Sequence, residues 1–313
     1  MLERTPASTG DGTPMRSLML PLALALVCLL ALAGTAQAAK VAVVASGEGL
    51  SLPAGVAVTP NGDVWVTDGE RGVCRVDPGG TPKLVESPYC LPHVEGGPEP
   101  LGPTGSLQMA FDPVSSNFFV AEGTSKGAGV WRMHYDSVMN TIDSHVRVVN
   151  TGENRLAGLA LSPEGHVDFT GGNDHAVRRL ANAGTAAPGT PTPVVGTTAG
   201  TSAAQLANLG GALYIAEPGG VTRIATPGVG DTNAVPVPGF PGGTATTLAA
   251  DPANNVVYAG TANASAIDQV DVLKPGDVVQ TYETGFAFTT AMGVAPDGTL
   301  YVADDPLTGG GAA

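Results

Sequence analysis

A short unit recurs along the chain and constrains its fold more than any other feature. The clearest copy is GVAVTPNGDVWVTD, from Gly55 to Asp68, in which two apolar segments flank a Pro-Asn-Gly turn. Because Pro presets φ and Gly accepts a positive φ, this pattern favours a tight β-hairpin. Five weaker copies follow, and the turn position recurs every 43 to 53 residues, at Pro60, Pro113, Pro163, Leu209, Pro252 and Pro296.

Each repeat holds more than one hairpin. Apolar residues alternate at strand period through every copy, and no segment shows convincing helical periodicity. A third strand is recognisable in four copies (GVCRV, GVWRM, AVRRL and GVTRI), and a variable fourth strand follows as PKLVE, VRVVN, PTPVV, AVPVP or VVQTY. Four strands in about 45 residues are typical of a propeller blade. The pattern therefore predicts an all-β, six-bladed β-propeller with four-stranded blades.

The last repeat shows only two clear strands before the sequence ends at Ala313. A propeller has to close, because an open ring leaves an exposed strand edge. The segment KVAVVAS, from Lys40 to Ser46, is a spare strand near the other end of the sequence. We predict that this N-terminal strand closes the last blade as its outer strand.

The first residues have the features of a secretory signal peptide. Met15-Arg16-Ser17 supplies a positive charge, Leu18 to Ala33 is apolar and free of charge, and Ala36-Gln37-Ala38 offers a small-residue cleavage site. The apolar run is shorter than the roughly 20 residues that span a bilayer, which favours cleavage over a retained anchor. We expect residues 1–38 to be the signal peptide, with 1–14 as an upstream extension if translation starts at Met15. Residues 39–313 are then an exported propeller, periplasmic or extracellular.

Acidic residues outnumber basic ones, and the formal net charge is −14. Nucleic acids and anionic membranes bind basic surfaces, so neither is an expected partner of the mature chain. The acidic balance suits solubility outside the cytoplasm and is compatible with cation binding. We expect a monomer whose partner is a protein or a small-molecule ligand.

Two cysteines, Cys74 and Cys90, remain after signal cleavage. An exported protein meets an oxidising compartment, which favours a disulfide between them over two separate thiols. A bridge across this spacing would stabilise the fold by about 3 kcal/mol in the chain-entropy model.

Two segments resemble NHL repeats: LPAGVAVTPNGDVWVTDGERGVCRV, from Leu52 to Val76, and MGVAPDGTLYVADD, from Met292 to Asp305. The wider group that they resemble includes the SMP-30/gluconolactonase-like and streptogramin-lyase-like propellers. The resemblance implies the blade structure along the mature chain. Relatives use this fold for very different activities, so function has to be argued from individual residues.

The second strand of each blade should end at the face where propeller loops bind ligands. The residues expected there are Asp68, Glu122, Gly171, Glu217, Gly260 and Asp304. Four of them are carboxylates, which are suitable ligands for Ca²⁺ or another divalent cation if they converge. The alternative is that each acid caps the turn into the third strand of its own blade.

The resemblance to the lactonases implies a divalent metal held by Glu, Asn and Asp side chains. Glu95, in VEGGPEP, stands in the one Glu-Gly-Gly context near the first blades, but it lies in a loop between blades. This set is therefore not carried over, and no Asn occupies the place that it needs.

A streptogramin-lyase-like reaction would need a histidine base on the same face. His175 follows a second strand, and His93 lies in a Pro-rich loop that can reach the channel mouth. A single loop histidine is more often exposed than catalytic. We therefore favour a non-catalytic binding scaffold over the alternative, a metal-dependent lactonase, hydrolase or lyase.

Arginines recur at one place in the third strands, at Arg75, Arg132, Arg178 and Arg223. Recurrence favours a role within the blade over an anion site. We expect each stem to lie on apolar surface with its head paired to an acid.

Overall fold

Antiparallel sheets follow one another along the chain and form a β-propeller. The computed structural model describes residues 50, 53–77, 83–91, 106–123, 128–150, 156–171, 176–195, 205–228, 234–240, 244–262, 268–273, 279–286 and 288–304. All of these belong to one compact unit spanning residues 42–313. None of the described segments is helical, so none of them is a helix long and apolar enough to cross a membrane.

Within the described residues, five sheets have four strands, and each is a meander in chain order. The first blade comprises β1 to β4, at Pro53–Val58, Val64–Asp68, Gly72–Asp77 and Lys83–Val85. The second comprises β5 to β8, at Ser106–Asp112, Asn117–Glu122, Gly129–Asp136 and Thr141–Asn150. The third comprises β9 to β12, at Leu156–Leu161, Val167–Gly171, Val177–Leu180 and Thr192–Val195.

The fourth blade comprises β13 to β16, at Leu206–Leu209, Ala212–Glu217, Gly220–Ile224 and Val235–Pro236. The fifth comprises β17 to β20, at Thr244–Asp251, Val256–Ala262, Asp268–Leu273 and Gln280–Phe286. The remaining sheet has two strands among the described residues, β21 (Thr289–Val294) and β22 (Leu300–Asp304).

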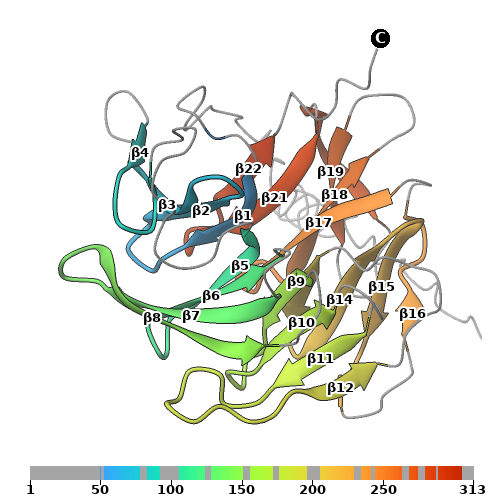
Figure 1. Cartoon of the computed structure of the whole chain (residues 1–313). Coiled ribbons are helices and arrows are strands. Elements are labelled where there is room, and N and C mark those ends of the chain that lie inside the picture. The colour runs from blue at the N-terminus through green and yellow to red at the C-terminus, as the bar shows by residue number, and fades with distance from the viewer. Residues whose placement is uncertain are drawn as a thin grey trace, which may run out of the picture. The chain divides into compact units, whose positions relative to one another are not determined.

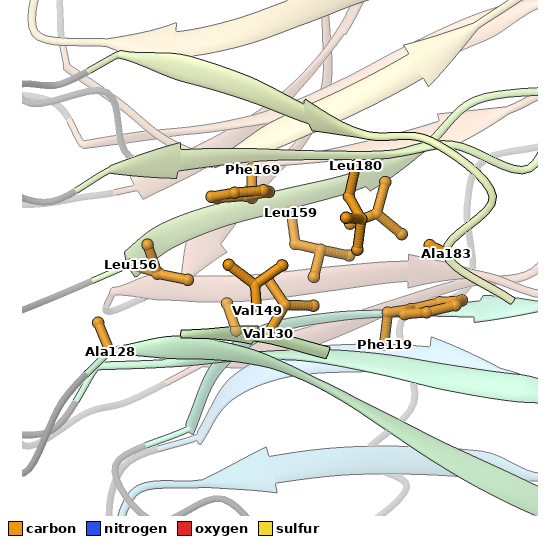
Figure 2. Close-up of a cluster of buried hydrophobic side chains, with 11 residues drawn as sticks. Phe119, Ala128, Val130, Val149, Leu156, Leu159, Phe169, Leu180 and Ala183 are labelled. Atoms are coloured by element: carbon orange, nitrogen blue, oxygen red, sulfur yellow. The ribbon is translucent and has the colours of Figure 1, made fainter. Parts of the chain in front are cut away.

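The first strands of neighbouring sheets contact one another around the axis (Figure 1). β1 contacts β5, β5 contacts β9, and the series continues through β13 and β17 to β21, which returns to β1. The buried apolar clusters lie between successive sheets in the same order. Figure 2 shows the cluster between the second and third blades, where Phe119, Leu159 and Phe169 are buried. Each such side chain stabilises the fold by about 1.5–3 kcal/mol.

The predicted tight turns are present between the first and second strands. The glycines of three copies take positive φ, at 87° for Gly62, 78° for Gly165 and 86° for Gly298. Their amides donate to the carbonyls of Thr59, Ser162 and Ala295, at 2.9 to 3.0 Å. The pattern of Pro followed by Gly therefore identified these hairpins correctly.

The prediction of four-stranded propeller blades is confirmed for five sheets. The sixth sheet was expected to have four strands. Within the described residues it has two, and no third strand pairs with β22. The proposed closing strand, Lys40 to Ser46, and the proposed signal peptide, residues 1–38, lie outside the described residues.

Candidate functional site

The strand register fixes which residues are equivalent in the six sheets. In every sheet a small residue of the first strand lies opposite a larger residue of the second, in the pairs Ala57–Trp65, Ala110–Phe119, Ala160–Asp168, Ala207–Tyr214, Ala249–Tyr258 and Gly293–Tyr301. Counting three residues on from each larger residue gives the second-strand ends. The fifth of these is Thr261, not Gly260 as the sequence pattern suggested, and the other five are as expected.

Asp68 is fully buried and bonds within its own turn. Its Oδ1 accepts hydrogen bonds from the backbone amides of Glu70 at 2.9 Å and Arg71 at 3.0 Å. These two amides belong to the turn that leads into β3. The geometry is that of a turn-capping aspartate, the alternative to metal ligation.

Glu122 is directed toward the outer strands of its blade. The Trp131 indole donates to its Oε2 at 2.8 Å, and Arg147 forms an ion pair with the same oxygen. The Arg147 guanidinium also lies 5.0 Å from the centre of the Trp131 ring. The Glu122 side chain is only 5% exposed, and these two partners offset the free-energy cost of burying its charge.

Glu217 and Asp304 also contact their own sheets. Glu217 is half-buried and lies opposite Gly220 across the tight turn between β14 and β15. Asp304 is exposed, and its Oδ1 accepts the backbone amide of Phe288 at 2.8 Å. Within the described part of the chain, no three His, Cys, Asp or Glu residues lie close enough together to hold a metal ion. The four predicted metal ligands are therefore not brought together.

Of the histidines that the structure describes, His166 lies in the turn between β9 and β10, and His134 and His145 lie on the outer two strands of the second blade. His134 forms a 2.8 Å contact with Asp143 on the outer hairpin of the second blade, and this bond lowers the pKa of Asp143. His145 Nδ1 lies 3.4 Å from the Tyr89 hydroxyl. His93 and His175, the candidate bases, lie outside the described residues, as does Glu95.

Cys74 and Cys90 form the disulfide that the sequence predicts. It joins β3 to a short segment that includes Tyr89, whose carbonyl accepts the Val73 amide at 2.7 Å. The Tyr89 ring is buried against the second blade and makes an edge contact with His145. Burial raises the pKa of Tyr89. The disulfide therefore anchors a contact between the first two blades.

Arginines recur at equivalent positions of the register in the third strands, and their side chains contact residues of the same blade or of the next one. Arg75, Arg132 and Arg223 lie opposite Trp65, Phe119 and Tyr214, and the equivalent arginine of the third blade is Arg179, not Arg178. Arg178 lies opposite Phe169, one place along the strand.

Arg179 and Arg132 each reach into the next blade. Arg179 Nε and Nη2 donate to the two oxygens of buried Asp168, both at 2.7 Å, and this raises the pKa of Arg179. Its Nη1 donates to the Pro227 carbonyl at 3.0 Å. Arg132 Nη1 donates to the Ala183 carbonyl at 3.2 Å. A pairing of the expected kind is formed by Arg179, which the sequence pattern did not select, and Arg75 makes a looser contact of 4.0 Å with Asp63.

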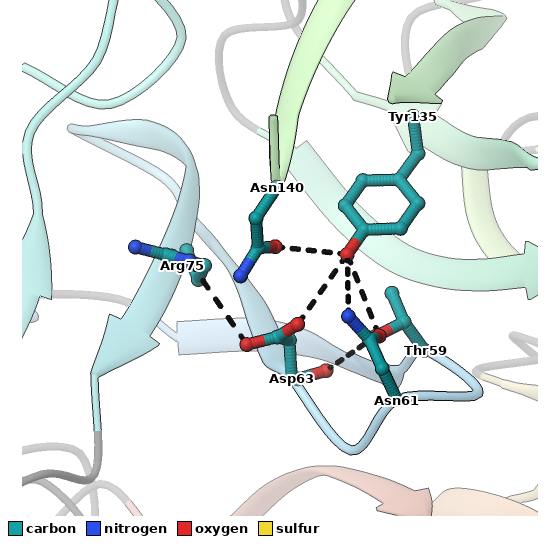
Figure 3. Close-up of polar contacts among 6 residues, drawn as sticks. All are labelled: Thr59, Asn61, Asp63, Arg75, Tyr135 and Asn140. Carbon is teal, nitrogen blue, oxygen red and sulfur yellow. Dashed lines mark hydrogen bonds and ion pairs between the residues drawn. The ribbon is translucent and has the colours of Figure 1, made fainter. Parts of the chain in front are cut away.

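Tyr135 joins the first blade to the second at the end opposite the second-strand acids (Figure 3). Its hydroxyl donates to Asn140 Oδ1 at 2.8 Å and accepts from Asn61 Nδ2 at 3.1 Å. Asp63 Oδ2 lies 3.3 Å away. Burial raises the pKa of Tyr135. The Tyr135 hydroxyl lies at the centre of this group. Its hydrogen bonds connect the turn between β1 and β2 to the turn between β7 and β8.

Two buried glutamines, Gln108 and Gln205, lie at the propeller axis. Neither can be recognised as an axial residue until the first strands are aligned by register. The available signal is the small size of the equivalent residues, which are Gly55, Gly158, Thr247 and Ala291.

Comparison with known proteins agrees with the repeat and the fold. Residues 50–76 match the family model of the NHL repeat. The chain carries an NHL repeat. No curated protein matches its sequence.

Solved propellers superimpose on most of the chain at low sequence identity. A gluconolactonase from Xanthomonas campestris has a TM-score of 0.60 and 14% identity, over 83% of this chain and 85% of that one. A glucose dehydrogenase from Thermus thermophilus has 0.56 and 18%, over 85% and 94%. A streptogramin B lyase has 0.53 and 14%, over 85% and 93%. Identities this low establish a shared fold and leave the activity to be argued from the site.

Proposed function

We propose that this chain is an exported NHL-type propeller that acts as a binding scaffold for a protein or small-molecule ligand. The observation that supports it is the use of the second-strand acids. Asp68 caps its own turn, Glu122 bonds Trp131 and Arg147, and Asp304 bonds Phe288. These acids lie at the face where propellers bind ligands, and their side chains form hydrogen bonds that stabilise the blades. The rigid ring then serves as a support for recognition loops.

The charge of the chain narrows the class of ligand. A net charge of −14 attracts cationic partners, is compatible with neutral ones, and repels nucleic acids and anionic membranes. The scaffold is proposed to act as a monomer outside the cytoplasm, after cleavage behind Ala38. N-terminal sequencing of the exported protein tests this directly, and a first residue other than Ala39 would contradict that cleavage site.

The two-stranded sheet is proposed to be a sixth blade. β21 packs against both β17 and β1, as the first strand of a blade should. Among the described residues β22 pairs only with β21, so the sheet is open on that side, and the segment Lys40 to Ser46 is proposed to be its outer strand. The short apolar run of this segment, from Val41 to Ala45, is consistent with a strand. Deleting residues 40–46 should then speed hydrogen exchange in β22, and unchanged exchange there would count against the closure.

A second candidate function is a lactonase, hydrolase or lyase at the same face. It is favoured by the fold shared with the gluconolactonase and the streptogramin B lyase. The residues proposed for it are Asp68, Glu122, Glu217 and Asp304, with His175 and His93 as bases. The described acids do not fit a Ca²⁺ ion or another divalent cation, because no three of them form a ligand set. A metal-assisted step therefore has no support from this arrangement.

Turnover measurements separate the two functions. The purified mature chain is assayed with a gluconate lactone and with a type B streptogramin, each with and without EDTA. The scaffold proposal expects no turnover of either compound. Turnover that is lost in Glu122→Gln or His175→Ala, but kept in Asp297→Asn, would overturn it. Asp297 is a suitable control because it lies in a turn at the opposite end of its sheet and is exposed.

A further inference from the structure

Two buried glutamine side chains, from the second and fourth blades, hydrogen-bond to the first strands of other blades. Gln108 lies in β5 and Gln205 lies directly before β13, and each is only 7% exposed. Both stand two residues before the alanine that faces the second strand of the same blade. A buried primary amide is costly unless its donors and acceptor are used.

Gln108 connects three first strands. Its Nε2 donates to the Leu206 carbonyl at 2.8 Å. Its Oε1 accepts the amides of Leu159 at 2.6 Å and Leu206 at 3.0 Å. These bonds run from β5 to β9 and β13.

Gln205 connects the remaining first strands. Its Nε2 donates to the Thr290 carbonyl at 2.9 Å and to the Ala54 carbonyl at 3.4 Å. Its Oε1 accepts the Leu248 amide at 3.4 Å and the Thr247 hydroxyl. These bonds run from the start of β13 to β17, β21 and β1. Together, the two glutamines bond to or belong to all six first strands.

The first and last sheets meet where β21 packs against β1, and the two backbones approach closely there. Gly293 replaces the alanine found at this place in the other five first strands. A Cβ there would lie 2.9 Å from both Cγ1 and the carbonyl oxygen of Val56. Gln205 donates to one carbonyl on each side of this junction, Thr290 in β21 and Ala54 in β1. The last sheet therefore docks on the first through a backbone approach that is bridged by one side chain.

We propose that Gln205 is the latch that closes the propeller ring, and that Gln108 braces the opposite half. Removing the Gln205 amide leaves the Ala54 and Thr290 carbonyls without this donor at the junction. The junction should then open more often than the other blade contacts. The latch acts at the first strands, near the axis, so it is independent of any strand that completes the rim of the last sheet.

Hydrogen exchange read by mass spectrometry tests the latch on the mature chain. Gln205→Met keeps the axis filled and removes the amide, so it is the main variant, and Gln205→Ala is the harsher one. The structure predicts exchange about tenfold faster in β21, β22 and β1, and also in β17, whose Leu248 amide loses its acceptor, with β9 unchanged. Gln108→Met is the matched control, because its effect should fall on β9 and β13 and spare β21.

Three outcomes would overturn the proposal. Exchange in β1 and β21 could stay at the wild-type rate in Gln205→Met. The increase could be uniform across all sheets, which would indicate general destabilisation. Gln108→Met could speed exchange at the β21–β1 junction as much as Gln205→Met does.

Discussion

The ion pair between Asp168 and Arg179 supports a quantitative prediction. Asp168 is fully buried, and the Arg179 side chain is only 16% exposed. The other five sheets have an aromatic residue in place of Asp168, so the third blade has exchanged apolar contact for a charged pair. Changing Asp168→Asn keeps the shape, removes the charge and points an amide donor at the guanidinium.

The expected loss is about 3–5 kcal/mol, because breaking a buried pair leaves an uncompensated charge. That is a large part of the roughly 5–15 kcal/mol by which a domain is stable. Replacing both partners by apolar residues, Asp168→Leu with Arg179→Met, should recover most of it, since the double variant buries no charge.

The assay is urea unfolding at neutral pH, followed by far-UV circular dichroism. The matched control is Asp143→Asn, which removes the partner of His134 in a pair whose side chains are 46% and 45% exposed. This exposed pair should contribute no more than about 1 kcal/mol. The reasoning is refuted if Asp168→Asn costs no more than Asp143→Asn, or if the double variant is as unstable as the single one.

Three further predictions follow from the geometry. Gly293→Ala should lose about 1–3 kcal/mol by calorimetry from its clash with β1, whereas Gly228→Ala, with nothing within 4 Å of the added Cβ, should change stability by less than about 1 kcal/mol; equal effects would contradict the close approach. Cys74→Ala with Cys90→Ala should lower the free energy of unfolding by about 3 kcal/mol, given the separation of 16 residues, and an unchanged urea midpoint would oppose this. Burial raises the pKa of Tyr258 to about 12, so its contribution to stability should be complete below about pH 10 and fall as the pH rises toward 12; ultraviolet titration showing an ordinary phenol would refute this.

The repeat pattern predicts the blades because hairpin turns and strand alternation are local properties. The turn at Gly62 and the strands beside it follow from residues that are neighbours in the sequence. Register is less secure, since a shift of one residue moves a side chain to the other face. For this reason the sequence pattern predicts Arg178 and Gly260 at the places that Arg179 and Thr261 occupy.

The axial glutamines could not be predicted in the same way. The bonds of Gln205 reach residues 151 and 85 positions away in the sequence. No local pattern records such distances, and only the closed ring brings the partners together. The second-strand acids were correctly placed, but their partners depend on side-chain direction. The sequence left capping and metal binding open for Asp68, and the backbone amides of Glu70 and Arg71 favour capping.

Residues that recur in every blade and residues that break the repeat have different roles in this chain. The second-strand ends carry oxygen atoms in most sheets, and Glu122, Thr261 and Asp304 bond within their own blades, as Thr261 does by donating to Asp271 at 2.7 Å. Recurrence at such a position therefore reports what a blade needs to fold. Gln205 and Gly293 depart from the repeat, and both lie where the ring closes. A search for what distinguishes this propeller from its structural neighbours should begin with such departures, because a property shared by all blades cannot select one ligand.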